Sequence, residues 1–107
     1  MISTHILDTS KGAPAAGVGV RLQKLDKNQW VTLNSGKTNV DGRFVFTGEV
    51  LAGSYQIIFE TEDYLKKEVK DFFFLNVPVA FKVEDINRNY HVPLLLNPFG
   101  FSTYRGS

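Results

Sequence analysis

The stretch Val18-Gly19-Val20-Arg21-Leu22-Gln23 decides the fold class, because apolar residues alternate along it with polar residues or glycine. Alternation with a period of two places the apolar side chains on one face of a strand and the others on the opposite face. Residues 77–84 repeat the pattern, and residues 30–33 and 55–59 are rich in the aromatic and β-branched residues typical of strands. The chain is therefore predicted to consist mainly of short, half-buried strands.

Turn-forming residues separate these strands at short intervals. They occur in four places: Lys11-Gly12-Ala13-Pro14, Asp26-Lys27-Asn28, Asp41-Gly42 and Ala52-Gly53-Ser54. Short strands at this spacing predict an all-β sandwich. With 107 residues, of which 43% are hydrophobic, we expect one domain spanning residues 1–107.

One segment departs from the strand pattern and predicts a helix of about two turns. Thr61 is expected to cap it, and Glu62 and Asp63 would place negative charge in its first turn. Two acid–base pairs have the i, i+4 spacing of ion pairs: Glu62–Lys66 and Asp63–Lys67. Three apolar residues would line one face: Leu65, Val69 and Phe72. The charges are expected to form a solvated surface.

Two prolines lie inside predicted strands. Pro78 and Pro93 each remove a backbone donor, which predicts that both strands lie near a sheet edge or at a bulge. Apolar edge strands invite pairing with other chains unless they are blocked or used deliberately. Edge-to-edge dimerisation would be one orderly solution.

Composition excludes several classes of function. A formal net charge of +1 argues against a nucleic-acid partner, and no apolar run approaches the ~20 residues that span a membrane. The absence of cysteine excludes thiol nucleophiles, disulfides and thiolate metal sites. The start of the chain lacks the basic and apolar regions of a signal peptide, so we expect a soluble, cytoplasmic protein.

The chain has only two histidines, His5 and His91, and either could transfer protons near neutral pH. In a strand, His5 would share a face with Ser3 while Asp8 points the other way, which argues against a His5–Asp8 dyad. For either histidine, the alternative is a purely structural role, in which the side chain makes a hydrogen bond at the end of a strand. A zinc site needs three or four ligands, and no third ligand lies at a suitable spacing, so no metal is expected.

Arg43 and the last four residues, Tyr104-Arg105-Gly106-Ser107, are the other candidates. Arg43 could direct its guanidinium at a planar, oxygen-rich ligand, or could be a solvated charge beside a turn. The phenol, guanidinium, hydroxyl and carboxylate of the final residues suit a small, polar, anion-prone ligand. Ser107 lacks the G-x-S-x-G surroundings of a nucleophile, which favours a hydrogen-bonding role.

Together these segments resemble the 5-hydroxyisourate hydrolases, transthyretin-related enzymes of purine breakdown. Three blocks carry the resemblance: Ser3-Thr4-His5-Ile6-Leu7-Asp8 followed by Gly12-Ala13-Pro14-Ala15-Ala16-Gly17-Val18; Thr38-Asn39-Val40-Asp41-Gly42-Arg43; and Tyr90-His91-Val92-Pro93-Leu94-Leu95-Leu96 through to Ser102-Thr103-Tyr104-Arg105-Gly106-Ser107. Asn89 departs from the pattern, because many relatives have a further histidine there.

The resemblance implies a transthyretin-like β-sandwich of two four-stranded antiparallel sheets with one short helix. It also implies a homotetramer, a dimer of dimers, with active sites built from more than one subunit in a central channel. The implied reaction is hydrolytic opening of 5-hydroxyisourate at a cyclic amide, which gives 2-oxo-4-hydroxy-4-carboxy-5-ureidoimidazoline without a metal or organic cofactor.

The resemblance also assigns roles to residues. His91 would activate the attacking water, His5 would bind the ring and shuttle protons, and Arg43 would hold substrate oxygens and stabilise developing charge. Tyr104 would contact the substrate and Ser107 would position water or a histidine. Which histidine is the general base stays open.

Two other classes of function compete with this hypothesis. A transthyretin-type carrier of an aromatic ligand would use the same fold, but such carriers lack the histidine pair and the Tyr-Arg-Gly-Ser ending. A structural or adhesive β-sandwich would need no polar constellation and would leave the matching blocks unexplained.

Overall fold

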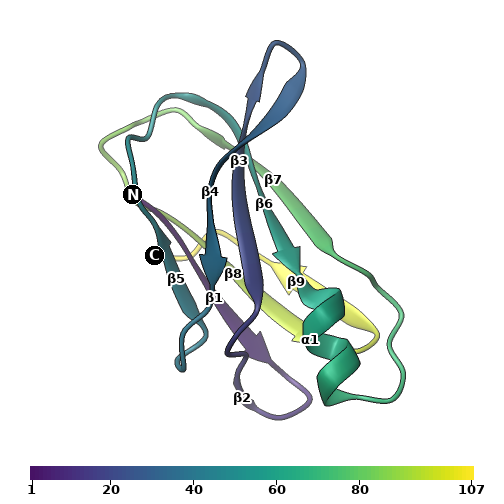
Figure 1. Cartoon of the computed structure of the whole chain (residues 1–107). Helices are drawn as coiled ribbons and strands as arrows, with labels where there is room; N and C mark the ends of the chain where they lie inside the picture. The colour runs from purple at the N-terminus through teal and green to yellow at the C-terminus, as the bar shows by residue number, and fades with distance from the viewer.

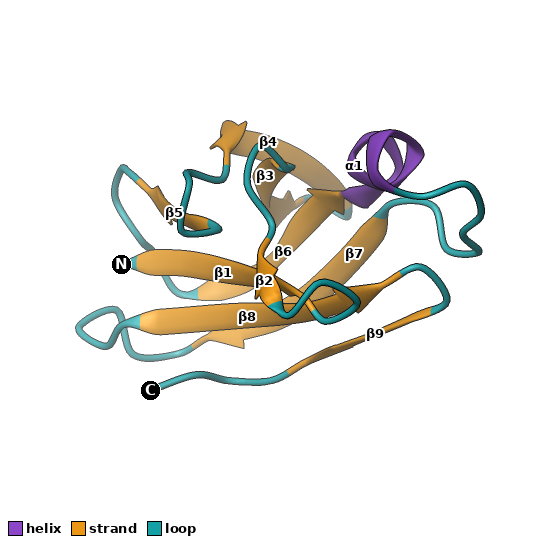
Figure 2. Cartoon of the chain, turned by 90° about the horizontal axis from the view of Figure 1, so that it is seen from below, coloured by secondary structure: helices purple, strands orange, loops and turns teal.

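The computed structural model describes residues 1–107 as two packed layers of strands with one helix (Figure 1). The elements, in chain order, are β1 (Ile2–Asp8), β2 (Ala13–Pro14), β3 (Gly19–Asp26), β4 (Gln29–Lys37), β5 (Arg43–Phe46), β6 (Gly53–Glu60), α1 (Thr61–Glu68), β7 (Val77–Val83), β8 (Tyr90–Asn97) and β9 (Gly100–Thr103). The two ends of the chain lie at the same end of the molecule (Figures 1 and 2). The helix is too short and too polar to cross a membrane.

The first layer has the strand order β2-β1-β8-β9, with β5 also paired to β1, and the second has the order β4-β3-β6-β7 (Figure 2). The predicted all-β sandwich of two sheets is confirmed. The prediction of two four-stranded antiparallel sheets needs correction, because β5 and β2 share one edge of β1 and β1 runs parallel to β8. No hairpin joins β1 to β8, which are far apart in the chain, so nothing forces them to be antiparallel.

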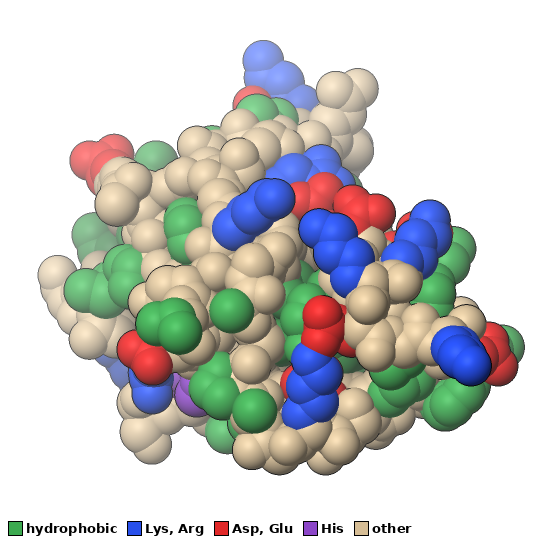
Figure 3. All heavy atoms as spheres, turned by 60° about the horizontal axis from the view of Figure 1, so that its bottom comes forward, with side chains coloured by type: hydrophobic (Ala, Val, Ile, Leu, Met, Phe, Trp, Pro, Cys, Tyr) green, Lys and Arg blue, Asp and Glu red, His purple; other side chains and the backbone are tan.

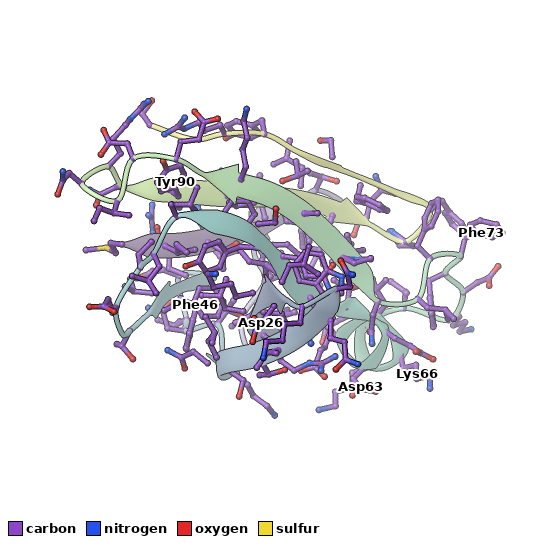
Figure 4. All side chains as sticks on the ribbon, turned by 90° about the horizontal axis from the view of Figure 1, so that it is seen from above. Asp26, Phe46, Asp63, Lys66, Phe73 and Tyr90 are labelled. Carbon is purple, nitrogen blue, oxygen red and sulfur yellow. The ribbon has the colours of Figure 1, made fainter.

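A core of 17 buried hydrophobic residues fills the space between the layers. The alternation that starts at Val18, just before β3, and continues along that strand places Val18, Val20 and Leu22 in this core, as the sequence predicts. Figure 4 shows Phe46 between the layers, whereas Phe73 projects from the loop after α1 and is 70% exposed. Burial of apolar surface on both inner faces holds the two sheets together.

The helix forms where predicted but begins and ends differently. Thr61 is its first residue and does not cap it; the Thr61 hydroxyl donates to the carbonyl of Leu75 at 2.8 Å. Asn76 Oδ1 instead accepts from the backbone N–H of Glu62 at 3.3 Å. The helix ends at Glu68, so Val69 and Phe72 are not helical, and Val69 is extended as β-branched residues prefer.

Charged side chains of both signs lie interspersed near the helix (Figure 3). The predicted pair Glu62–Lys66 forms with a separation of 3.2 Å, but Asp63 and Lys67 form no ion pair. Lys11 pairs with Glu68 instead. Exposed pairs of this kind contribute little to stability, about 0–1 kcal/mol each.

The two prolines have different outcomes. Pro78 lies in β7, an edge strand, as predicted. The prediction for Pro93 is wrong, because β8 lies between β1 and β9. Pro93 faces the terminal segment and has no N–H to donate to it. The pairing of β8 with the end of the chain is therefore interrupted there, between the Leu94–Thr103 pair and the later bridge from His91 to Gly106. Thr103 spans the interruption, since its hydroxyl donates to the Pro93 carbonyl at 2.7 Å.

Candidate active site

Three strands bring the predicted site residues onto the outer face of the first sheet. Along β1, Thr4 and Ile6 point into the core, so Ser3 and His5 point outward. The parallel register pairs Ser3 with His91 on β8, and the antiparallel register pairs His5 with Arg43 on β5. Residues from the beginning, middle and end of the chain therefore meet on one surface.

A tight turn before β5 places Arg43 opposite His5. Gly42 has φ +74°, and a Cβ there would lie 2.5 Å from the carbonyl oxygen of Ile6. The Gly42 carbonyl accepts from the Ile6 N–H at 2.8 Å, and Asn39 Oδ1 accepts from the Arg43 N–H at 3.0 Å. Only glycine fits this close backbone approach, which fixes where the Arg43 side chain begins.

The His91 ring is held from two sides. Ser3 Oγ lies 2.9 Å from its Nδ1. Gly106 lies against the opposite edge, where a Cβ would come within 2.6 Å of the ring's Cδ2. The Gly106 N–H donates to the His91 carbonyl at 2.8 Å, which ties the terminal segment to β8. Nε2 makes no hydrogen bond to the protein.

The surroundings of His91 keep its imidazole neutral. Partial burial, reinforced by the positive charge of Arg43 and by repulsion from His5, lowers the pKa of His91 below its usual 6.5. At pH 7 the ring is therefore unprotonated and able to accept a proton.

A cavity of about 250 Å³ opens beside this ring. Its lining joins both chain ends with parts of β1, β5 and β8: Met1, Ser3, Thr4, Arg43, Phe44, Val45, Asn89, His91 and Ser107. Three of the predicted site residues, Arg43, His91 and Ser107, thus share one cavity. His5 does not line it but neighbours Arg43 across the strand pair.

The terminal tetrapeptide divides between two places. Tyr104 is 57% exposed and lines a second cleft of about 230 Å³, to which His91 also contributes. The Arg105 guanidinium lies 4.8 Å from the ring centre of Tyr90, whose side chain points into the core. Tyr104 and Ser107 therefore line separate hollows, both of which His91 borders, and β7 of the second sheet forms part of the hollow with Tyr104.

Reasoning from the sequence missed two contributors. Ser3 was expected to share a face with His5 and lies in a block that matches the family, but it was not identified as a partner of His91, because the parallel pairing with β8 has no local sequence signal. Gly106 appeared only as part of the tetrapeptide, although its missing side chain makes room for the His91 ring. Asp8 points inward as predicted and accepts from Tyr64 at 2.7 Å, so no His5–Asp8 dyad forms.

The polar groups on this face suit a small, oxygen-rich ligand. One neutral imidazole can accept a proton, and a guanidinium nearby can bind or stabilise an oxyanion. No three His, Cys, Asp or Glu side chains come together as a metal site would need.

Comparison with known proteins identifies the family. The model of the HIUase/Transthyretin family matches residues 2–106. The chain belongs to this family. The 5-hydroxyisourate hydrolase of Salmonella dublin is 44% identical over 110 residues, covering all of this chain and 81% of the relative. The 5-hydroxyisourate hydrolases of Caulobacter vibrioides and Mus musculus are 46% and 39% identical, with 99% of this chain covered and 97% and 94% of those proteins.

Solved structures of the HIUase/Transthyretin family share the fold. The 5-hydroxyisourate hydrolase of Klebsiella pneumoniae matches with a TM-score of 0.86 and 36% identity, over 99% of this chain and 98% of its own. Sea bream transthyretin in complex with thyroxine matches with a TM-score of 0.93 but 27% identity, over 98% and 93% of the two chains. Both a hydrolase and a carrier share this backbone, so backbone similarity does not distinguish the two functions. The side chains of the site must distinguish them.

Proposed function

We propose that this protein is a 5-hydroxyisourate hydrolase that opens the substrate ring at a cyclic amide to give 2-oxo-4-hydroxy-4-carboxy-5-ureidoimidazoline. One observation carries the proposal: His91 and Arg43 line the same small cavity, and the surroundings of His91 lower its pKa, which favours the neutral, proton-accepting form. The names of relatives that are 39–46% identical over nearly the whole chain support the same substrate.

In this mechanism, water supplies the oxygen that forms a new bond to the amide carbon. Nε2 of His91 takes a proton from the attacking water, since it is the ring nitrogen without a protein partner. The Arg43 guanidinium stabilises the negative charge that develops on the carbonyl oxygen. The C–N bond then breaks, and a proton from the His91 imidazolium, or relayed through His5, goes to the departing nitrogen.

The remaining residues would orient the substrate. Ser107 reaches the cavity of His91 and can donate or accept a hydrogen bond to water. Tyr104 would contact the substrate from the neighbouring cleft, which His91 also borders. Support for both assignments is that each residue lines a hollow that His91 also borders.

The proposed active form is a homotetramer, a dimer of dimers. The candidate site lies on an outer sheet face, and Tyr104 is more than half exposed, so a single chain does not enclose a substrate. A second copy facing this sheet would exclude water from the site, which strengthens electrostatic interactions within it. Light scattering should give a mass four times the 12.0 kDa of one chain.

The proposal is tested by following the ultraviolet decay of 5-hydroxyisourate, generated in situ from urate by urate oxidase. The substrate also decays spontaneously, so the protein must accelerate decay in proportion to its concentration. ¹³C NMR should identify the ring-opened ureidoimidazoline as the first product. Tight binding of an aromatic ligand such as thyroxine, with no acceleration, would instead establish a carrier.

A further inference from the structure

Two contacts, one at each edge of the ring, fix the orientation of the His91 imidazole. Ser3 Oγ lies 2.9 Å from Nδ1, and Gly106 closes the opposite, Cδ2 edge. The backbone registers support both contacts, because Ser3 pairs with His91 across β1 and β8 and Gly106 bridges to His91 from the terminal segment. Rotation of the ring by 180° would therefore remove the contact between Ser3 and Nδ1.

A hydrogen bond at Nδ1 also determines what Nε2 can do. In a neutral imidazole one nitrogen carries the proton and the other accepts, so a proton on Nδ1 leaves Nε2 free to act as a base. The Ser3 hydroxyl can accept from Nδ1–H, because its oxygen has two lone pairs, and its own O–H can then donate to water. The same arrangement persists when Nε2 gains a proton, since both nitrogens of the imidazolium are donors.

We propose that Ser3 is a positioning residue for His91: its hydroxyl oxygen accepts from Nδ1–H and holds the tautomer in which Nε2, which has no protein partner, is unprotonated. The consequence for catalysis rests on the proposed hydrolase function, but the tautomer itself does not. Ser3 acts here through His91 and takes no part in bond making. The opposite arrangement, in which Ser3 donates to Nδ1, would make Nε2–H a donor unable to activate water.

Long-range ¹H–¹⁵N NMR of the ¹⁵N-labelled protein at pH 8 reports the tautomer directly. The chain has two histidines, so the His5→Gln variant leaves His91 as the sole source of imidazole signals. The expected spectrum has a protonated, pyrrole-type Nδ1 and a pyridine-type Nε2. A pyridine-type Nδ1 in the otherwise native protein would overturn the proposal.

Ser3→Thr and Ser3→Val form a matched pair, because both side chains are β-branched, favour strands and differ only in a hydroxyl against a methyl. Ser3→Thr should keep the native tautomer and a kcat within about twofold of the wild type. Ser3→Val should mix the tautomers and lower kcat by about 3- to 10-fold, the loss expected for one hydrogen bond, with little change in KM. Ser54→Ala, an exposed serine in the opposite sheet, controls for loss of a hydroxyl elsewhere.

The outcomes separate this proposal from the proposed function. If Ser3→Val keeps the native tautomer, Ser3 does not position the ring, whatever the activity. If the tautomer changes as expected but the wild type does not hydrolyse 5-hydroxyisourate, the positioning role stands and the assigned reaction fails. If neither Ser3→Val nor Ser3→Ala folds while Ser3→Thr does, the proposal is decided by the NMR spectrum of the protein with Ser3 intact: a protonated Nδ1 supports it and a pyridine-type Nδ1 overturns it.

Discussion

Replacement of Gly106 by alanine should strongly reduce the activity of the site while leaving the fold intact. A Cβ at this position would lie 2.6 Å from Cδ2 of His91 and 3.2 Å from Cγ of Pro93. Ordinary carbon contacts begin near 3.4 Å, so the ring and the terminal segment must separate by about 0.8 Å. Either the imidazole moves away from Ser3, or the bridge from the Gly106 N–H to the His91 carbonyl breaks.

The size of that displacement sets the expected loss of activity. A misplacement of about 1 Å in a catalytic group can lower a rate about 100-fold, so Gly106→Ala should reduce kcat between about 10- and 100-fold. The free energy of unfolding should change by less than about 1 kcal/mol, because only a bridge near the chain end is disturbed and the core is untouched.

The assay is the ultraviolet decay of 5-hydroxyisourate, accompanied by urea unfolding of each variant. Gly100→Ala provides the control in the same hairpin, since its Cβ would meet nothing closer than 3.8 Å, in the side chain of Asn97. Gly100→Ala should keep activity within about twofold, as expected for a surface substitution. Full activity in Gly106→Ala, with an unchanged NMR signal from His91, would refute the account of how the ring is held.

Three further substitutions test the core, the acid response and the electrostatics of the site. Leu94→Ala removes a fully buried side chain and should lower the free energy of unfolding by about 2–5 kcal/mol in urea titrations; a loss below 1 kcal/mol would contradict its place in the core. Burial alone would raise the pKa of Asp8, but hydrogen bonds from its neighbours, Tyr64 among them, outweigh this and hold that pKa below its usual value. The wild type should therefore lose stability as pH falls below about 4, and Asp8→Asn should remove that part of the acid dependence, whereas parallel pH profiles of the two proteins would show that Asp8 is not responsible. Arg43→Gln removes a positive charge near His91 and should raise the pKa of His91 in an NMR titration. An unchanged pKa would mean that Arg43 and His91 do not interact.

The sequence predicts those parts of the fold that depend on local pattern. Alternating apolar residues identify β3 and β7 because burial on one face follows directly from the geometry of a strand. The Asp26-Lys27-Asn28 segment forms a two-residue hairpin turn in which Lys27 and Asn28 have φ of 51° and 64°. Such features need only neighbouring residues.

Features that depend on distant pairing were missed. The side chain that caps the helix belongs to Asn76, which lies fourteen residues beyond Glu62, whose N–H it accepts from. The expected cap, Thr61, donates instead to the carbonyl of Leu75 in the loop. Pro93 can occupy an inner strand because its missing N–H would point toward the terminal segment, where the ladder is interrupted, and the pairing with β1 on the other side is kept. Both outcomes follow from the tertiary arrangement, which local propensity does not encode.

The candidate site shows the same division. The resemblance pointed to Arg43, His91 and Ser107, and the structure places all three around one cavity. Ser3 was not identified as a partner of His91, because the parallel register of β1 and β8 joins residues 88 positions apart. A strand face can be read from sequence, but the neighbour across the sheet cannot.

The most direct test of the central claim compares the wild type with His91→Gln in the 5-hydroxyisourate decay assay, at equal concentrations of folded protein. Glutamine can hydrogen-bond but cannot accept a proton at pH 7, so it removes the base and preserves polarity. The account predicts clear acceleration by the wild type and a fall of about 100-fold or more in His91→Gln, in the range of general base catalysis. Equal acceleration by both proteins would contradict it and place the chemistry elsewhere on this face.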